Sequence, residues 1–114
     1  MEKEPLVSII TPLYNSEKFI VETIKSVLAQ TYTNWEMIIV NDCSKDRGAY
    51  IVEKYSKKDK RIKLFNNEKN MGVSFTRNRA IDLSQGKYIA FLDSDDLWYK
   101  EKLKKQIKMM EEKN

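Results

Sequence analysis

Four short apolar runs, roughly 25 to 30 residues apart, constrain the fold of this chain most strongly. They span residues 6–10, 37–40, 62–65 and 88–92. The runs at 6–10, 37–40 and 88–92 are nearly continuous and rich in Ile, Val, Phe and Tyr, which is typical of strands covered on both faces of a parallel sheet. The run at 62–65 alternates with polar residues, so we place it nearer an edge of the sheet.

Patterns with a helical period lie between these runs. In residues 16–30, Ile20, Ile24, Val27 and Leu28 fall on one face, and Ser16 is a plausible N-cap. Further helices are expected over residues 46–56, with Ile51, Val52 and Tyr55 inward; over 73–83, ending near Gly86; and from about residue 100, with Leu103, Ile107 and Met110 inward. Strands alternating with helices predict an α/β fold with right-handed crossovers.

The 114 residues suit one domain, 1–114, and the balance of 41% hydrophobic and 33% charged residues is that of a globular protein. No apolar run approaches the ~20 residues needed to span a bilayer. Residues 1–5 lack the apolar core of a secretory signal. Cys43 is the only cysteine, so no internal disulfide can form, which fits a reducing, cytoplasmic location.

The net charge of +4 is concentrated in residues 54–61 and 100–114. Solvated helix faces are the favoured interpretation of these two segments. The alternative is a basic surface for nucleic acid or anionic lipid. Because no nucleic-acid motif is present, we expect no nucleic-acid partner, and a peripheral position at the inner membrane face stays open.

Polar or turn-forming residues follow every predicted strand. Ligands bind at the carboxyl ends of strands in open parallel sheets, so these segments should line one site: residues 11–15, 41–46, 66–72 and 93–96. The segments at the opposite rim, 31–35, 57–61 and 84–87, resemble ordinary connections.

Asp93, Asp95 and Asp96 supply hard oxygen ligands at one strand end. The chain has three glycines and no glycine-rich phosphate loop, so a divalent cation would have to neutralise any bound phosphates. Mg²⁺ and Mn²⁺ suit carboxylates, whereas the absence of histidine argues against zinc. The alternative is that Asp95 or Asp96 merely caps the last helix.

Two further residues have two interpretations each. Asp42 is either an Asx turn leaving a strand or a carboxylate facing a ligand N–H, such as the imide of uracil. Arg77 either forms an ion pair with a strand-end aspartate or faces a diphosphate. Asn78 could link loops, and Arg79 is expected at the surface.

Four stretches together resemble the nucleotide-sugar-binding half of a family 2 glycosyltransferase: VSIITPLYN, VNDCSKD, NMGVSFTRNRAI and GKYIAFLDSDD. The resemblance covers residues 7–98. It implies a Rossmann-like GT-A fold, with a mostly parallel four-stranded sheet and helices on both faces. It also implies that residues 1–114 are the N-terminal, donor-binding part of a longer enzyme.

The resemblance assigns roles residue by residue. The loop lining the nucleoside matches Thr11, Pro12, Tyr14 and Asn15, and the acid that pairs with the base matches Asp42. The stretch beside the donor matches Gly72, Ser74, Arg77 and Asn78, and the D-x-D motif matches Asp93, Ser94 and Asp95. The implied cofactor is Mn²⁺ or Mg²⁺, held by Asp95 with Asp96 next.

The implied reaction transfers a sugar from a nucleoside-diphosphate donor, UDP-sugar favoured, with inversion, to a glycan, lipid-linked or other acceptor. The family's general base lies well beyond the D-x-D motif, but only 18 residues follow Asp96, and Glu101, Glu111 and Glu112 do not match it. We therefore expect this chain to bind the donor without turnover. An apolar face left exposed would favour self-association.

Three other classes are weighed against this one. A receiver domain would need an acidic pair after the first strand, where Thr11 and Pro12 stand. A magnesium-dependent phosphoryl-transfer or nuclease domain could also use D-x-D. Haloacid-dehalogenase-like phosphatases place this motif after their first strand, whereas here it follows the fourth. A non-catalytic binding or interaction domain is the third.

Overall fold

The computed structural model describes residues 4–113 and is an α/β fold. The residues before Glu4, which include part of the segment assessed for a secretory signal, lie outside the described residues, as does Asn114. The elements follow in strict alternation: β1 Val7–Leu13, α1 Ile20–Leu28, β2 Trp35–Asn41, α2 Gly48–Lys58, β3 Ile62–Asn66, α3 Val73–Leu83, β4 Tyr88–Phe91 and α4 Lys102–Lys113.

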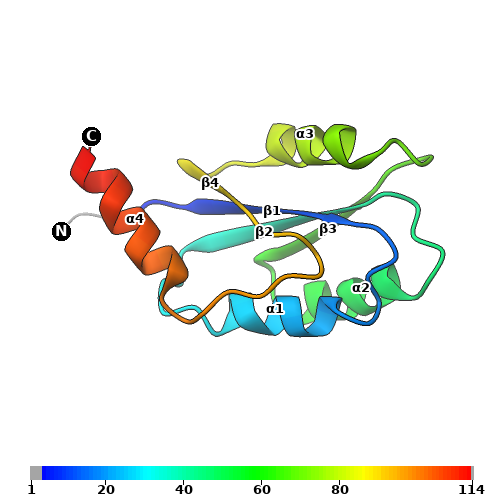
Figure 1. Ribbon diagram of the computed structural model, residues 1–114, viewed down its shortest axis with the longest axis horizontal. Coiled ribbons are helices and arrows are strands. Elements are labelled where there is room, and N and C mark those ends of the chain that lie inside the picture. The colour runs from blue at the N-terminus through cyan, green and yellow to red at the C-terminus, as the bar shows by residue number, and fades with distance from the viewer. Residues whose placement is uncertain (1–3, 114) are drawn as a thin grey trace.

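All four strands are parallel and form one sheet in the order β3-β2-β1-β4. Figure 1 shows α3 on one face of the sheet and α1 with α2 on the other, while α4 lies at the end of the sheet away from the loops that follow β1, β2 and β3. The predicted fold class is confirmed, and β3 lies at an edge as expected.

The alternation of side chains along β1 divides the core between the two faces. Ile9 points into the larger cluster, which includes residues of α1, α2 and α4, while Ile10 points into a smaller cluster with Ala80 of α3. Every residue of β2 is buried, as expected for a strand covered on both faces.

The run ending in β4 is not covered on both faces, which corrects the sequence interpretation. β4 is the second edge strand, and Phe91 is 55% exposed on it. Leu28, expected inward, is also exposed, because α1 ends there. The helices predicted from residues 46 and 100 begin later, at Gly48 and Lys102.

Ser16 is not the N-cap of α1, which corrects a second expectation. The cap position is Phe19, without a side-chain cap bond. The Ser16 carbonyl instead accepts hydrogen bonds from the Phe19 and Ile20 N–H groups, so a turn precedes the helix. The Ser16 hydroxyl is thereby left to bond elsewhere, and it does so at the site described below.

Glu36, near the amino end of β2, is a buried carboxylate that joins three parts of the chain. It accepts hydrogen bonds from the Ser8 hydroxyl at 2.5 Å and from the Gln85 N–H at 2.7 Å, and it pairs with Lys63 at 2.9 Å. This network lies at the end of the sheet opposite the predicted site. Within residues 4–113, no helix is long and apolar enough to cross a membrane.

Candidate nucleotide-binding site

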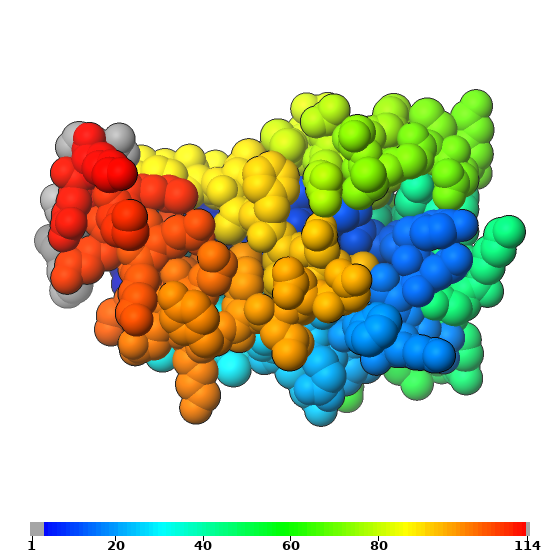
Figure 2. Space-filling model, in the orientation of Figure 1, coloured from blue at the N-terminus to red at the C-terminus, as the bar shows by residue number. Residues whose placement is uncertain are grey.

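A cleft of about 480 Å³ opens at the carboxyl ends of the strands, between α3 and the loops that follow the four strands. Figure 2 shows the surface dip between α3, in yellow-green, and the blue loop after β1. Each of the four segments that the sequence placed on one rim contributes to the lining, and Ser16 and α3 add to it. The lining residues are Pro12, Tyr14, Ser16, Asp42, Asn70, Gly72, Val73, Thr76, Arg77, Asp93, Ser94 and Asp95.

The cleft exists because β4 is shorter than its neighbour β1. β4 pairs with β1 only as far as Phe91, opposite Ile10, whereas β1 continues beside β2 as far as Leu13. From residue 11 onward β1 therefore has a strand on one side only. Pro12, which lacks a backbone N–H, is tolerated in an otherwise central strand for the same reason. The strand order reverses between β1 and β4, and ligands of open α/β sheets bind at such a switch point.

Asp42 forms one wall of the cleft and is almost fully buried. Its Oδ1 accepts hydrogen bonds from the Met71 N–H at 2.7 Å and from Asn67 Nδ2 at 3.0 Å, and its Oδ2 accepts one from the Gly72 N–H at 3.0 Å. Burial raises the pKa of Asp42, but these hydrogen bonds together lower it more, so the pKa lies below its ordinary value. Asp42 is therefore a charged acceptor at neutral pH.

Asp42 makes no Asx turn of the kind weighed from the sequence. The neighbouring Asn41 bonds to the loop after β2 instead, since its Oδ1 accepts a hydrogen bond from the Ser44 N–H three residues on. The bonds of Asp42 hold the loop before α3, in which Gly72 adopts φ +89°, a conformation that favours glycine. Asp42 thus has a structural role as well as a position on the cleft.

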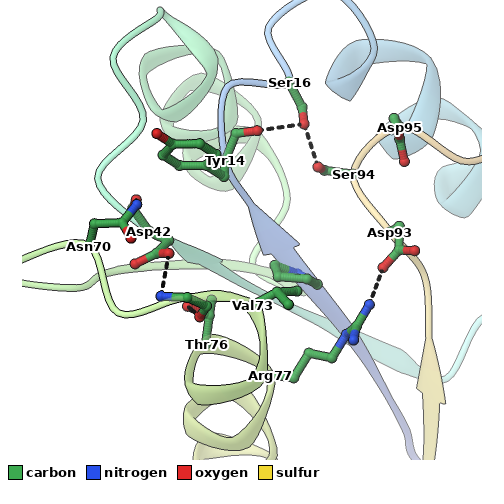
Figure 3. Close-up of a pocket in the computed structure, with 12 residues that line it drawn as sticks. Tyr14, Ser16, Asp42, Asn70, Val73, Thr76, Arg77, Asp93, Ser94 and Asp95 are labelled. Atoms are coloured by element: carbon green, nitrogen blue, oxygen red, sulfur yellow. Dashed lines mark hydrogen bonds and ion pairs between the residues drawn. The ribbon is translucent and has the colours of Figure 1, made fainter.

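The opposite wall consists of Arg77 and residues from the acidic loop 93–96, which follows β4 (Figure 3). Arg77 Nη2 lies 3.0 Å from Asp93 Oδ1, and both side chains are more than a third exposed. The ion pair weighed from the sequence is thus present. An exposed pair contributes only about 0–1 kcal/mol, so a stronger anion could draw Arg77 away.

Thr23, in α1, and Ser16 fix the conformation of the acidic loop. The Ser16 and Ser94 hydroxyls lie 2.6 Å apart. The Thr23 hydroxyl lies 2.9 Å from the Ser94 carbonyl and 2.7 Å from the Asp96 carbonyl. Asp95 is exposed and lines the cleft, while Oδ1 of Asp96 accepts a hydrogen bond from the Leu97 N–H. Because α4 begins only at Lys102, neither Asp95 nor Asp96 is its N-cap, and the capping alternative is wrong.

Five predicted site residues do not line the cleft: Thr11, Asn15, Ser74, Asn78 and Asp96. Thr11 is fully buried, and among the described residues its hydroxyl has no hydrogen-bond partner. Asn15 ties two loops together, because its Oδ1 accepts from the Lys45 N–H and its own N–H donates to Ser44. Ser74 and Asn78 are exposed on α3.

Four residues that line the cleft were not singled out from the sequence: Ser16, Asn70, Val73 and Thr76. Asn67, which supports the cleft, was not singled out either, although the segment 66–72, with Asn67 and Asn70, was expected at this rim. Arg79, expected at the surface, is half-buried and donates to the Asn66 carbonyl and to Asn67 Oδ1. The spacing of Thr76 and Arg79 on α3 was a usable signal, because they are three residues apart and share a helix face. The contacts of Asn67 depend on a loop conformation that no local pattern predicts.

The model of glycosyl transferase family 2 matches residues 8–114. The chain belongs to this family. It is 50% identical over 111 residues to TuaG of Bacillus subtilis, described as a teichuronic acid biosynthesis glycosyltransferase, covering 97% of this chain and 44% of TuaG. It is 49% identical over 109 residues to WfgD of Escherichia coli, a UDP-Glc:α-D-GlcNAc-diphosphoundecaprenol β-1,3-glucosyltransferase, covering 96% of this chain and 42% of WfgD.

Among solved structures, S. aureus TarS 1–349 in complex with UDP superposes with a TM-score of 0.85 at 39% identity, over 93% of this chain and 32% of that one. The fold of this family 2 chain is therefore of the GT-A type. The chain spans less than half the length of these relatives. Because the chain belongs to this family, it is neither a receiver domain nor a haloacid-dehalogenase-like phosphatase.

The acidic residues at the cleft suit a metal ion that is held partly by the protein and partly by a bound substrate. The described residues contain no cluster of three acid, cysteine or histidine side chains able to hold an ion by themselves. Mg²⁺ and Mn²⁺ are commonly held by one or two carboxylates together with waters and phosphate oxygens. Asp95, exposed on the cleft near the Arg77–Asp93 pair, suits that arrangement.

Proposed function

We propose that this chain is the donor-binding part of a glycosyltransferase that uses a nucleoside-diphosphate sugar, with UDP as the nucleotide. The observation behind the proposal is the cleft itself, which has a charged acceptor, Asp42, on one wall and a cation, Arg77, with acids on the other. This separation suits a ligand with an N–H group at one end and a diphosphate at the other.

UDP is favoured over other nucleotides by the chemistry of Asp42 and by the relatives. An ionised carboxylate only accepts hydrogen bonds, and the N3–H of uracil donates one. TarS, the structure at 39% identity, is complexed with UDP or with UDP-GlcNAc, and WfgD is named for a UDP-Glc donor. Tyr14, exposed at the rim, offers an aromatic face beside the base.

At the other end of the nucleotide, Arg77 would exchange its exposed partner Asp93 for diphosphate oxygens, with which a guanidinium bonds more strongly. Asp95 would hold Mn²⁺ or Mg²⁺, with Asp96 as the second candidate. The cation would stabilise negative charge that develops on the departing nucleoside diphosphate. We propose that the transfer is inverting, that the base acting on the acceptor belongs to a longer protein, and that the 114 residues bind the donor without turnover.

Titration calorimetry with UDP, GDP and dTDP, with and without Mn²⁺, tests the proposal. We expect UDP to bind best, binding to strengthen with Mn²⁺, and Asp42→Ala to reduce UDP affinity about tenfold or more through loss of a charged hydrogen bond. Equal binding of UDP and GDP by the unmodified chain would contradict the assignment of the nucleotide. Sugar transfer by the purified 114-residue chain would contradict the absence of turnover.

A further inference from the structure

Asn67 lies beneath Asp42 and bonds to its carboxylate without lining the cleft itself. Asn67 is only 7% exposed, and its side chain and backbone groups make five hydrogen bonds with the surrounding segments. We propose that Asn67 is a positioning residue for base selection, which holds Asp42 so that one acceptor position faces the cleft. The inference rests on the proposed function and deepens it.

The orientation of the Asn67 amide is fixed from outside the cleft by Arg79. Arg79 Nη1 donates to Asn67 Oδ1 at 2.9 Å and to the Asn66 carbonyl at 2.7 Å. Since arginine only donates, the oxygen of the Asn67 amide must face Arg79, and the NH₂ group must face the opposite way. The orientation of the amide is therefore set by chemistry and not left free to flip.

The NH₂ group of Asn67 lies 3.0 Å from Asp42 Oδ1 and 3.0 Å from the Thr76 hydroxyl oxygen. The Thr76 hydroxyl donates its own hydrogen to the Gly72 carbonyl at 2.7 Å, so toward Asn67 it accepts. Both N–H bonds of the amide are thus used in buried surroundings. Arg79, Asn67 and Asp42 form a directed chain of donors and acceptors that ends at the cleft.

The hydrogen bonds within the protein leave one acceptor position of the Asp42 carboxylate for a ligand. A carboxylate offers about four lone-pair positions. Asn67 and Met71 occupy both positions on Oδ1 of Asp42, and Gly72 occupies one on Oδ2. One position on Oδ2 remains, which matches a base with a single N–H at that edge, such as uracil. Cytosine, whose N3 is itself an acceptor, would be repelled.

The test compares the affinities of UDP and CDP for Asn67→Ala, with Asn66→Ala as the matched control. Asn66 is adjacent to Asn67, and its side chain accepts a hydrogen bond from Asn41 but makes none with Arg79, Asn67 or Asp42. Truncation of Asn66 therefore leaves the hydrogen bonds between those three residues in place. We expect the preference for UDP over CDP to fall about tenfold in Asn67→Ala, by loss of the fixed charged acceptor, and to persist in Asn66→Ala. If Asn67→Ala only disturbed the structure, the affinities for UDP and CDP would fall by the same factor and their ratio would stay unchanged.

A double variant distinguishes direct from indirect action. If Asn67 acts through Asp42, Asn67→Ala should change the UDP to CDP ratio no further once Asp42→Ala is present. Should Asn67→Ala fail to fold, Arg79→Ala gives the same test from the half-buried end of the chain of bonds, because the amide is then free to turn. A full UDP preference in Asn67→Ala, or in Arg79→Ala, overturns the positioning role.

The outcomes also distinguish this inference from the proposed function. If the unmodified chain shows no preference for UDP over CDP, or if Asp42→Ala keeps that preference, the assignment of the base site fails and the positioning role fails with it. If Asp42→Ala loses the preference but Asn67→Ala keeps it, only the positioning role fails.

Discussion

Glu36 and Asp42 are buried carboxylates at opposite ends of β2, and they show how the surroundings of a side chain decide its role. Burial raises the pKa of Glu36, but its hydrogen bonds with Ser8 and the Gln85 N–H and its pairing with Lys63 outweigh it, so the pKa is lowered. Asp42 is held charged in a similar way. Only Asp42 lines the cleft, so only Asp42 is available to a ligand.

Glu36→Gln tests the energetic role of the first carboxylate. Because the substitution removes the charge that pairs with the partly exposed Lys63 and weakens the bonds from Ser8 and the Gln85 N–H, we expect the free energy of unfolding in urea near neutral pH to fall by about 1–2 kcal/mol. The folded pKa lies below the ordinary value of 4.5, so the stabilisation from ionised Glu36 is complete above that value and is lost as the pH falls through the folded pKa.

The unmodified chain should therefore lose more stability than Glu36→Gln between about pH 6 and pH 3. The other carboxylates with lowered pKa values, Asp42 and Asp59, are common to both proteins, so the difference isolates Glu36. Parallel pH profiles for the two proteins would show that Glu36 contributes nothing through its charge.

At the scale of elements, α4 is the helix whose attachment was hardest to predict. Its sequence is strongly basic, and its apolar stripe is sparse. In the structure Leu103 and Ile107 are buried in the larger core cluster, and the Leu103 N–H donates to Gln30 Oε1. The helix is therefore packed on the domain with its lysines on the side away from the core. This agrees with the interpretation of the basic segment 100–114 as a solvated helix face.

Leu103→Ala should lower the free energy of unfolding by about 2–5 kcal/mol, because it removes a fully buried side chain from the core. Met109→Ala is the matched control in the same helix. Met109 is 57% exposed, so its truncation should change stability by no more than about 0.5 kcal/mol. Equal effects of the two substitutions in urea denaturation would mean that α4 is not docked in solution.

At the scale of the whole molecule, the cleft is assembled from loops distant in sequence, and no single loop holds enough ligands for a cation. The described residues contain no cluster of three acid, cysteine or histidine ligands, so metal and nucleotide should bind cooperatively. Asp95 would contribute the protein's share, and the diphosphate the remainder.

We expect calorimetry to detect weak Mn²⁺ binding by the chain alone and tighter binding once UDP is present. By linkage, Mn²⁺ must strengthen UDP binding by the same factor. Asp95→Ala should abolish that factor, whereas Asp82→Ala, which removes an exposed acid of α3 that does not line the cleft, should preserve it. Mn²⁺ binding that is equally tight with and without UDP would exclude a shared site, and Asp96→Ala would show whether Asp96 takes part.

The edge strand β4 bears on assembly. Phe91, Leu97 and Tyr99, on and just after β4, are each more than half exposed. Self-association through this region stays a prediction, as does a peripheral position at a membrane. The role of residues 1–114 as one part of a longer enzyme also stays a proposal.

Much of the fold was determined by local sequence. Continuous apolar runs and helical periodicity identified all eight elements, and their alternation fixed parallel strands, since a crossover helix returns the chain to the same end of the sheet. The same reasoning placed Asp42 and the acidic loop at one rim, where they line one cleft, whereas the position of Arg77 beside them was implied by the family resemblance.

Only the tertiary structure decided how those residues are used. β4 stops opposite Ile10 while β1 continues, which opens the cleft and leaves Phe91 uncovered. The turn before α1 frees the Ser16 hydroxyl for Ser94, and the loop before α3 brings Asn67 beneath Asp42. Such contacts join segments far apart in sequence and depend on relative strand length and loop conformation, which local patterns do not contain.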